Sequence, residues 1–175
     1  NEIIVLKEDG TVWSAGYNNN GQLGDGTTVN RSLLVQMLKA ENEPVTGIEH
    51  VYASGYTSTL LRSDNKGIYT AGINSNGQLF TGDKTVRKYA TEVETDKNIR
   101  TAVITKNESG SQTGAVVDTD GMIYTVGFNT NGEIGNNTVE ALTTPWCISE
   151  KKITVDENIY NFENIGETAQ ITYGS

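Results

Sequence analysis

Cysteine is almost absent from this 175-residue chain, in which Cys147 is the only one. A single cysteine excludes an intrachain disulfide, so packing and hydrogen bonding must stabilise the fold. This composition suits the cytosol, and it also suits exported bacterial proteins that use few disulfides.

Long apolar runs and basic residues are also scarce. No stretch is long enough to span a bilayer, and no basic-then-apolar signal peptide opens the chain. The sequence begins at Asn1 and leads at once into an apolar run, so we expect it to be part of a longer protein. Lysine and arginine number 13 against 22 acidic residues, a formal net charge of −9. Because an acidic surface repels phosphate backbones, we expect no nucleic-acid partner. The lack of long apolar runs leads us to expect no membrane insertion.

Glycine, in contrast, is abundant and regularly placed, with 19 residues against two prolines. Residues 9–26 read DGTVWSAGYNNNGQLGDG, and related stretches return at residues 65–82 and 120–137. The shared glycine, asparagine and apolar positions are separated by steps of 56 and then 55 residues. A fixed period of this size indicates an internal repeat of the propeller or solenoid kind.

The repeat contains short β-rich runs separated by turn residues. Asp9-Gly10 and Asp120-Gly121 predict tight hairpins, because glycine accepts a positive φ. The second copy has Asn65-Lys66 there, with Gly67 one place late, which predicts a different turn. We expect strands at residues 3–6, 11–15, 33–38, 50–54, 58–61, 68–71, 89–93, 99–105, 114–118, 122–126 and 146–148, with 40–47 as a turn-rich connector.

About four β-segments per 55-residue unit predict an all-β fold of β-propeller blades, with about three repeats. We place the propeller repeat region at residues 1–150 and a separate segment at 151–175, where the glycine-asparagine signature is lost. Closed propellers need about four to eight blades. We therefore expect either a part of a longer propeller or self-association that completes one.

The repeated string Asp-Gly-x-Val-Tyr/Trp-x-x-Gly-x-Asn-x-x-Gly-Gln-Leu-Gly resembles the repeat of the regulator of chromosome condensation family, whose members form β-propellers, usually of seven blades. The first copy carries almost the whole pattern, the second has Phe80 in place of a glycine, and the third has Glu133 in place of the glutamine. In the segment before each copy, Ser58 and Gln112 stand where the family usually has histidine. The resemblance covers residues 1–148.

The remaining tail resembles the first strands of a bacterial immunoglobulin-like domain of the group 2 type. The matching residues are Ile153, Val155, Asn164, Gly166, Glu167, Thr168, Gln170 and Ile171. Propellers fused to such domains are typical of large bacterial surface or secreted proteins. The resemblance therefore implies an extracellular or cell-surface location.

The Asn-rich loops at residues 18–25 and 129–136 superficially resemble calcium loops, which space oxygen ligands two residues apart. Their ligand positions are mostly neutral asparagine, and no bidentate glutamate follows. We favour a structural role, in which asparagine and glycine form tight turns. His50 has no nucleophile marked by any motif. We predict no metal site, no cofactor, no catalytic residue and no enzymatic activity.

Two groups of apolar side chains share repeat positions. Trp13, Tyr69 and Tyr124 are expected to pack between blades. Tyr17, Ile73 and Phe128 leave a strand toward a rim, where aromatic residues often anchor protein partners. A binding site should also break the repeat, as residues 31–43, 81–89, 107–112 and 139–145 do. Our candidate partner-binding residues are Tyr17, Asn19, Asn20, Ile73, Phe128 and Thr130.

We predict from these features a non-catalytic module that binds a protein or a glycan, within a bacterial surface or secreted multidomain protein. The resemblance leaves two alternatives open. One is a regulator like a guanine nucleotide exchange factor, acting on a small GTPase. The other is a secreted enzyme inhibitor.

Overall fold

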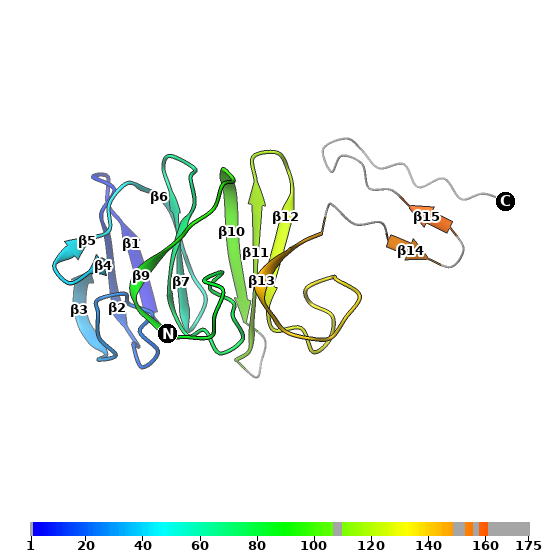
Figure 1. Ribbon diagram of the computed structural model, residues 1–175. Helices are drawn as coiled ribbons and strands as arrows, with labels where there is room; N and C mark the ends of the chain where they lie inside the picture. Colours follow the sequence, from blue (N-terminus) through cyan, green and yellow to red (C-terminus); the bar gives the residue numbers. More distant parts are fainter. Residues whose placement is uncertain (1, 107–109, 149–152, 156–157, 161–175) are drawn as a thin grey trace.

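The computed structural model describes residues 2–106, 110–148, 153–155 and 158–160. These residues form an all-β structure in which three antiparallel sheets lie side by side in chain order (Figure 1). Each sheet is one propeller blade. The described residues contain no apolar helix of the length that a bilayer crossing requires.

The blades are antiparallel meanders built from consecutive strands. Blade 1 consists of β1 (Glu2–Leu6), β2 (Val12–Gly16) and β3 (Arg31–Gln36). Blade 2 consists of β6 (Ile48–Ala53), β7 (Thr57–Arg62), β8 (Ile68–Gly72) and β9 (Arg87–Val93). Blade 3 consists of β10 (Ile99–Lys106), β11 (Gln112–Asp118), β12 (Ile123–Gly127) and β13 (Leu142–Cys147).

The hairpin at the start of each copy occupies the same place in its blade. β1 pairs with β2 as β7 pairs with β8 and β11 with β12, so blade 1 holds the counterparts of the last three strands of the others. Gly10 and Gly121 have φ of 77° and 85°, as tight turns require. In the second copy Asn65 (φ 60°) and Gly67 (φ 144°) share this task. The predicted difference at this turn is confirmed.

The extra residue in that turn corrects one of our sequence equivalences. The N–H of Ile73 donates to the carbonyl of Tyr56, and the N–H of Phe128 donates to that of Gln112, both over 3.0 Å. Tyr56 is therefore the counterpart of Gln112, and the pairing of Ser58 with Gln112 is wrong. The repeat step is 56 residues before the turn and 55 after it, because blade 2 carries one more turn residue.

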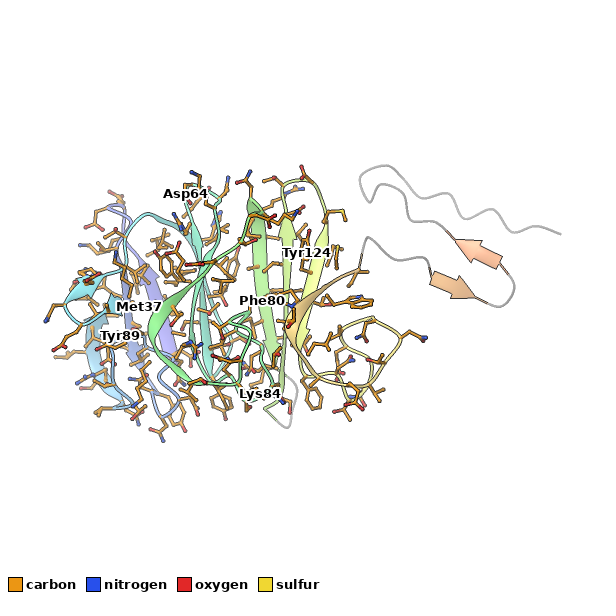
Figure 2. The ribbon with its side chains drawn as sticks, viewed as in Figure 1. Met37, Asp64, Phe80, Lys84, Tyr89 and Tyr124 are labelled. Atoms are coloured by element: carbon orange, nitrogen blue, oxygen red, sulfur yellow. The ribbon has the colours of Figure 1, made fainter. Side chains whose placement is uncertain are left out.

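The core lies between blades. The first junction, between blades 1 and 2, buries Val12, Met37, Val45, Ile48, Leu60, Ala71 and Ala90. The second junction, between blades 2 and 3, buries Leu61, Ile68, Phe80, Ile99, Ala102, Val116 and Val126. Tyr69 packs against the first set and Tyr124 against the second, so the predicted packing role of these two residues is confirmed. Figure 2 labels Met37 in the first set, Phe80 in the second set and Tyr124 beside the second set.

The linkers that enter the two junctions differ in length. Residues 37–47 lead from β3 to β6, whereas only residues 94–98 lead from β9 to β10. The longer linker folds into a small hairpin of β4 (Leu38–Ala40) and β5 (Glu43–Pro44), where the sequence predicts a plain connector. Asn42 closes its turn at a φ of 60°, a conformation that asparagine tolerates better than most residues.

Two further strands, β14 (Ile153–Val155) and β15 (Asn158–Tyr160), pair with each other. The other residues of 151–175 that carry the immunoglobulin-like resemblance lie outside the described residues. That part of the domain prediction therefore stays a prediction.

Candidate functional site

The Asn-rich loop of each blade is organised by one fully buried asparagine. In blade 1 the Asn18 Nδ2 donates to Oδ1 of Asp25 and to the carbonyls of Thr27 and Val29, over 3.1–3.2 Å. The Oδ1 of Asn18 accepts from the N–H of Leu23 over 2.9 Å. One side chain thus ties four points of the loop together, because an amide offers both donors and acceptors.

The same network recurs in the other two loops. Asn74 and Asn129 accept from the N–H groups of Leu79 and Ile134, five residues on. Both also donate to a carbonyl nine residues on, at 2.9 and 3.0 Å. These amides are engaged in holding the loop, so the structural interpretation of the asparagines is confirmed. The described residues contain no group of three or more histidine, cysteine or acidic side chains that could hold a metal ion.

Ion pairs reinforce the loops of blades 1 and 2. The Arg31 Nε lies 2.7 Å from Oδ2 of Asp25, and Arg87 Nη2 lies 2.7 Å from Oδ2 of Asp83. Burial raises the pKa of Asp25, but hydrogen bonds from Thr27 and Arg31 outweigh it and lower the pKa overall. In Asp83 the hydrogen bond from Arg87 is the main cause of the lowered pKa. The first strand residue after the third loop is Leu142, which cannot form this ion pair.

In the first two loops a glutamine forms hydrogen bonds to the next blade. Gln22 Nε2 donates to the carbonyl of Gly55 over 3.4 Å, and Gln78 Nε2 donates to Oε1 of Gln112 over 3.1 Å. Ser58 Oγ donates back to the carbonyl of Gln22 over 2.6 Å. The third copy has the exposed Glu133 in this position, which binds the N–H of Asn131 in its own loop.

A groove opens where these loops approach one another. This rim groove has a volume of about 360 Å³ and is lined by Tyr17, Asn20, Tyr56, Ile73, Ser75, Asn76, Gly110 and Ser111. Tyr17 leaves β2, Tyr56 precedes β7 and Ile73 leaves β8. Gly110 and Ser111 precede β11, so residues of all three blades meet here. Most of the lining is polar, with hydroxyl, amide and backbone groups facing the space.

Aromatic and cationic groups mark one side of the rim groove. The rings of Tyr17 and Tyr56 lie 6.1 Å apart at an interplanar angle of 52°. The Lys106 Nζ lies 4.5 Å from the centroid of the Tyr56 ring, within cation–π range. The groove therefore offers two tyrosine side chains and several hydrogen-bonding groups to a ligand, and the ammonium group of Lys106 lies over the Tyr56 ring.

Three of our candidate residues line this groove, namely Tyr17, Asn20 and Ile73. Asn19, Phe128 and Thr130 do not, and Asn19 and Thr130 are exposed to solvent. Phe128 follows β12 of blade 3 and donates its N–H to the carbonyl of Gln112.

The sequence interpretation missed Tyr56. The signal was present, because a tyrosine in one copy and a glutamine in the other break the repeat at this position. Because the sequence interpretation paired Ser58 with Gln112, it did not compare Tyr56 with Gln112 and so missed this difference. Ser111 lies within one of the predicted repeat breaks, at residues 107–112.

The two isolated reactive side chains lie elsewhere. His50 is exposed on β6, with its Nε2 3.8 Å from Oε1 of Glu49. Cys147 is half-buried at the end of β13. Neither lines the rim groove.

Comparison with known families and proteins identifies the repeat. Residues 9–61 match the Regulator of chromosome condensation (RCC1) repeat. The chain is 31% identical over 150 residues to the dog X-linked retinitis pigmentosa GTPase regulator, covering 85% of this chain and 14% of that protein. It is 30% identical over 137 residues to the Xenopus laevis Protein RCC2 homolog, covering 77% of this chain and 25% of that protein. The chain thus spans a quarter or less of the length of these relatives.

Solved structures share the fold. Yeast RCC1 (Prp20), in its structure with Kap60, superposes with a TM-score of 0.68 at 17% identity, over 85% of this chain and 35% of that one. Human WBSCR16 superposes with a TM-score of 0.65 at 20% identity, over 84% of this chain and 37% of that one. The repeat, the relatives and the shared fold together support the RCC1 β-propeller family.

Proposed function

Taking membership of the RCC1 repeat family as the premise, we propose that this chain is part of a β-propeller that binds a protein partner through the rim groove. The observation that carries the proposal is the meeting of Tyr17, Tyr56 and Ile73 from two blades around one opening. No single copy of the repeat supplies this surface.

The chemistry of the groove suits a protein ligand. Tyrosine is among the residues that contribute most to binding energy at protein interfaces, since it buries a large surface and keeps a polar end. The loops that present Tyr17 and Ile73 are held by the buried asparagines Asn18 and Asn74. A surface already fixed before binding loses little conformational freedom when the partner arrives.

Among protein partners, we propose a small GTPase. The dog relative is named a GTPase regulator, and a structural study of yeast Prp20p describes its binding to Gsp1p and histones. These relatives favour the regulator alternative over the bacterial surface module that the sequence alone favours. A role without covalent catalysis is part of the same proposal, because an exchange regulator acts by binding.

The bacterial, secreted and immunoglobulin-like features stay predictions, as do the cell-surface location and the enzyme-inhibitor alternative. These predictions rest on the resemblance of the tail and on the repeat family, and the geometry of the rim groove does not support any of them. Self-association to complete the propeller likewise stays a prediction.

Binding to a panel of small GTPases loaded with a fluorescent guanine nucleotide tests the proposal. Tyr17→Ala and Tyr56→Ala are each expected to weaken binding about tenfold or more, as hot-spot truncations do. Thr130→Ala is the matched control, because it lies in the equivalent loop of blade 3 and outside the groove. Binding that survives both tyrosine substitutions would rule out the rim groove. Binding without any change in nucleotide release would keep the groove and exclude exchange activity.

A further inference from the structure

The second blade junction contains a cavity. It has a volume of about 290 Å³ and is lined mainly by apolar side chains of blades 2 and 3, among them Ile68, Phe80, Val93, Ile99, Val116 and Pro145. The five-residue linker 94–98 passes along its edge. This cavity lies apart from the rim groove and shares none of its lining residues.

The repeat shows what occupies the same place in the first junction. Val93 is the counterpart of Met37, Ile99 of Ile48 and Val116 of Leu60. Each of these counterparts belongs to the first core cluster.

One member of that cluster, Val45, has no counterpart. It comes from the longer linker, is 1% exposed, and donates its N–H to the carbonyl of Met37 over 3.0 Å. The short linker of the second junction has no residue to place there. The cavity therefore lies where, in the first junction, the linker hairpin places the aliphatic side chain of Val45.

The edge of the cavity adds a charge preference. Glu94 and Asp96 are exposed on the short linker, and Lys97, the one lysine among the lining residues, has its Nζ 3.7 Å from Oδ2 of Asp96. The chain as a whole carries a net charge of −9. A basic segment is therefore attracted to this edge, and an acidic one is repelled.

We propose that this cavity is a second protein-binding site, which takes a tight-turn segment of a partner that bears lysine or arginine and inserts a branched aliphatic side chain where the first junction holds Val45. The inserted side chain would contact Phe80, Ile99 and Val116. Its backbone N–H would face the carbonyl of Val93, as that of Val45 faces Met37. Burial, together with neighbouring Cys147 and Asp118, raises the pKa of Tyr124 to about 12, so this lining tyrosine stays neutral.

A peptide copied from the chain's own hairpin is the probe. Its parent sequence is that of residues 37–47, MLKAENEPVTG, closed into a ring to hold the turn. A basic version carries Glu41→Lys and Glu43→Lys, and a third peptide adds Val45→Asp to the basic version. Calorimetric titration into the intact chain is expected to rank the basic peptide first. Loss of the aliphatic anchor in the third peptide is expected to weaken binding at least about tenfold.

A cavity-filling variant of the protein gives the independent test. Val93→Met introduces the residue that stands at this position in the first junction, and it is expected to abolish peptide binding by occupying the cavity beside Phe80. Equal binding of the basic peptide by the parent chain and Val93→Met would overturn the proposal. Equal affinity of the valine and aspartate peptides, or no saturable binding up to about 1 mM peptide, would overturn it as well. The peptide comparison stands on the unmodified chain even if Val93→Met does not fold.

Discussion

Gln78 donates a hydrogen bond from Nε2 to Oε1 of Gln112 across the second blade junction, over 3.1 Å. Both side chains are at most 1% exposed. Gln112 in turn donates to the carbonyl of Ser54 over 2.7 Å and to the hydroxyl of Thr57 over 3.2 Å. These bonds fix the orientation of the Gln112 amide, so the position of Gln78 requires a donor.

Gln78→Glu is expected to destabilise the protein by about 2–4 kcal/mol, because a buried carboxylate would replace the donor and face the oxygen of Gln112. The new carboxyl would have a raised pKa in the folded state, so lowering the pH through that pKa should recover part of the loss. Urea unfolding at pH 7 and at pH 5 measures both effects.

The matched control is the reverse change in the third copy. Glu133→Gln lies on the exposed face of blade 3 and is expected to shift stability by less than about 0.5 kcal/mol. A large effect of this variant, or a small effect of Gln78→Glu, would contradict the assigned role of the buried pair.

Alanine substitutions at two equivalent glycines compare a loop that packs against the next blade with one that does not, at nearly the same φ. Gly77 and Gly132 have φ of 82° and 84°. A Cβ at Gly77 would lie 2.8 Å from Cα of Thr143, whereas one at Gly132 would have no atom within 4 Å. Gly132→Ala should cost about 1–2 kcal/mol from the left-handed conformation alone. Gly77→Ala should cost at least about 1 kcal/mol more, since backbone would also have to move.

Denaturant midpoints at unchanged m-value measure this difference. Self-association could bury the Asn-rich loop of blade 3 as the next blade buries the other two loops. In that case Gly132→Ala should also reduce self-association, which light scattering would detect. Equal costs for the two alanine variants would show that the loop of blade 2 does not pack as described.

Phe80 holds a φ of 64°, where the first and third copies have Gly24 and Gly135 at 63° and 76°. Phe80→Gly should relieve backbone strain but remove a ring that is 7% exposed, with a net loss of about 2–4 kcal/mol. Adding Val93→Met would reproduce the Gly24 and Met37 pair of the first junction. The double variant should recover about 1 kcal/mol or more relative to Phe80→Gly. If the free energies of unfolding of the two substitutions are additive, the side chains at positions 80 and 93 do not compete for the same space.

The Asp25 side chain is 5% exposed and has a lowered pKa in the folded state. Its contribution to stability is therefore complete above the unfolded pKa of about 3.9 and is lost as the pH falls through the folded value. Asp25→Asn keeps an acceptor oxygen, as Asn136 does in the third loop, but loses the Arg31 ion pair. We expect a loss of about 1–2 kcal/mol at pH 7 and a shallower decline toward pH 2.

Unfolding midpoints measured at pH 7 and pH 3 compare the two proteins. Asp9, with a pKa lowered to about 2 by hydrogen bonds from Thr11, keeps part of the acid dependence in both. An unchanged acid slope in Asp25→Asn would show that Asp25 does not contribute to it.

The periodic residues of the sequence were sufficient to predict the blades. The hairpins at Gly10 and Gly121 and the loops around Asn18, Asn74 and Asn129 depend on bonds within about eleven residues. Such short-range bonds recur wherever the same residues recur. This is why three copies of one pattern predict three copies of one structure.

Contacts between copies are a different matter, because they depend on linker length and on a single extra turn residue. The sequence could not show that the rings of Tyr56 and Tyr17 lie side by side. Nor could it show that the linker with β4 and β5 places Val45 in the first junction, while the second junction contains a cavity. By itself the sequence determined what each blade is, since those bonds are local. Only the tertiary structure decided which side chains share a groove and where a cavity remains, because packing brings together residues that no period connects.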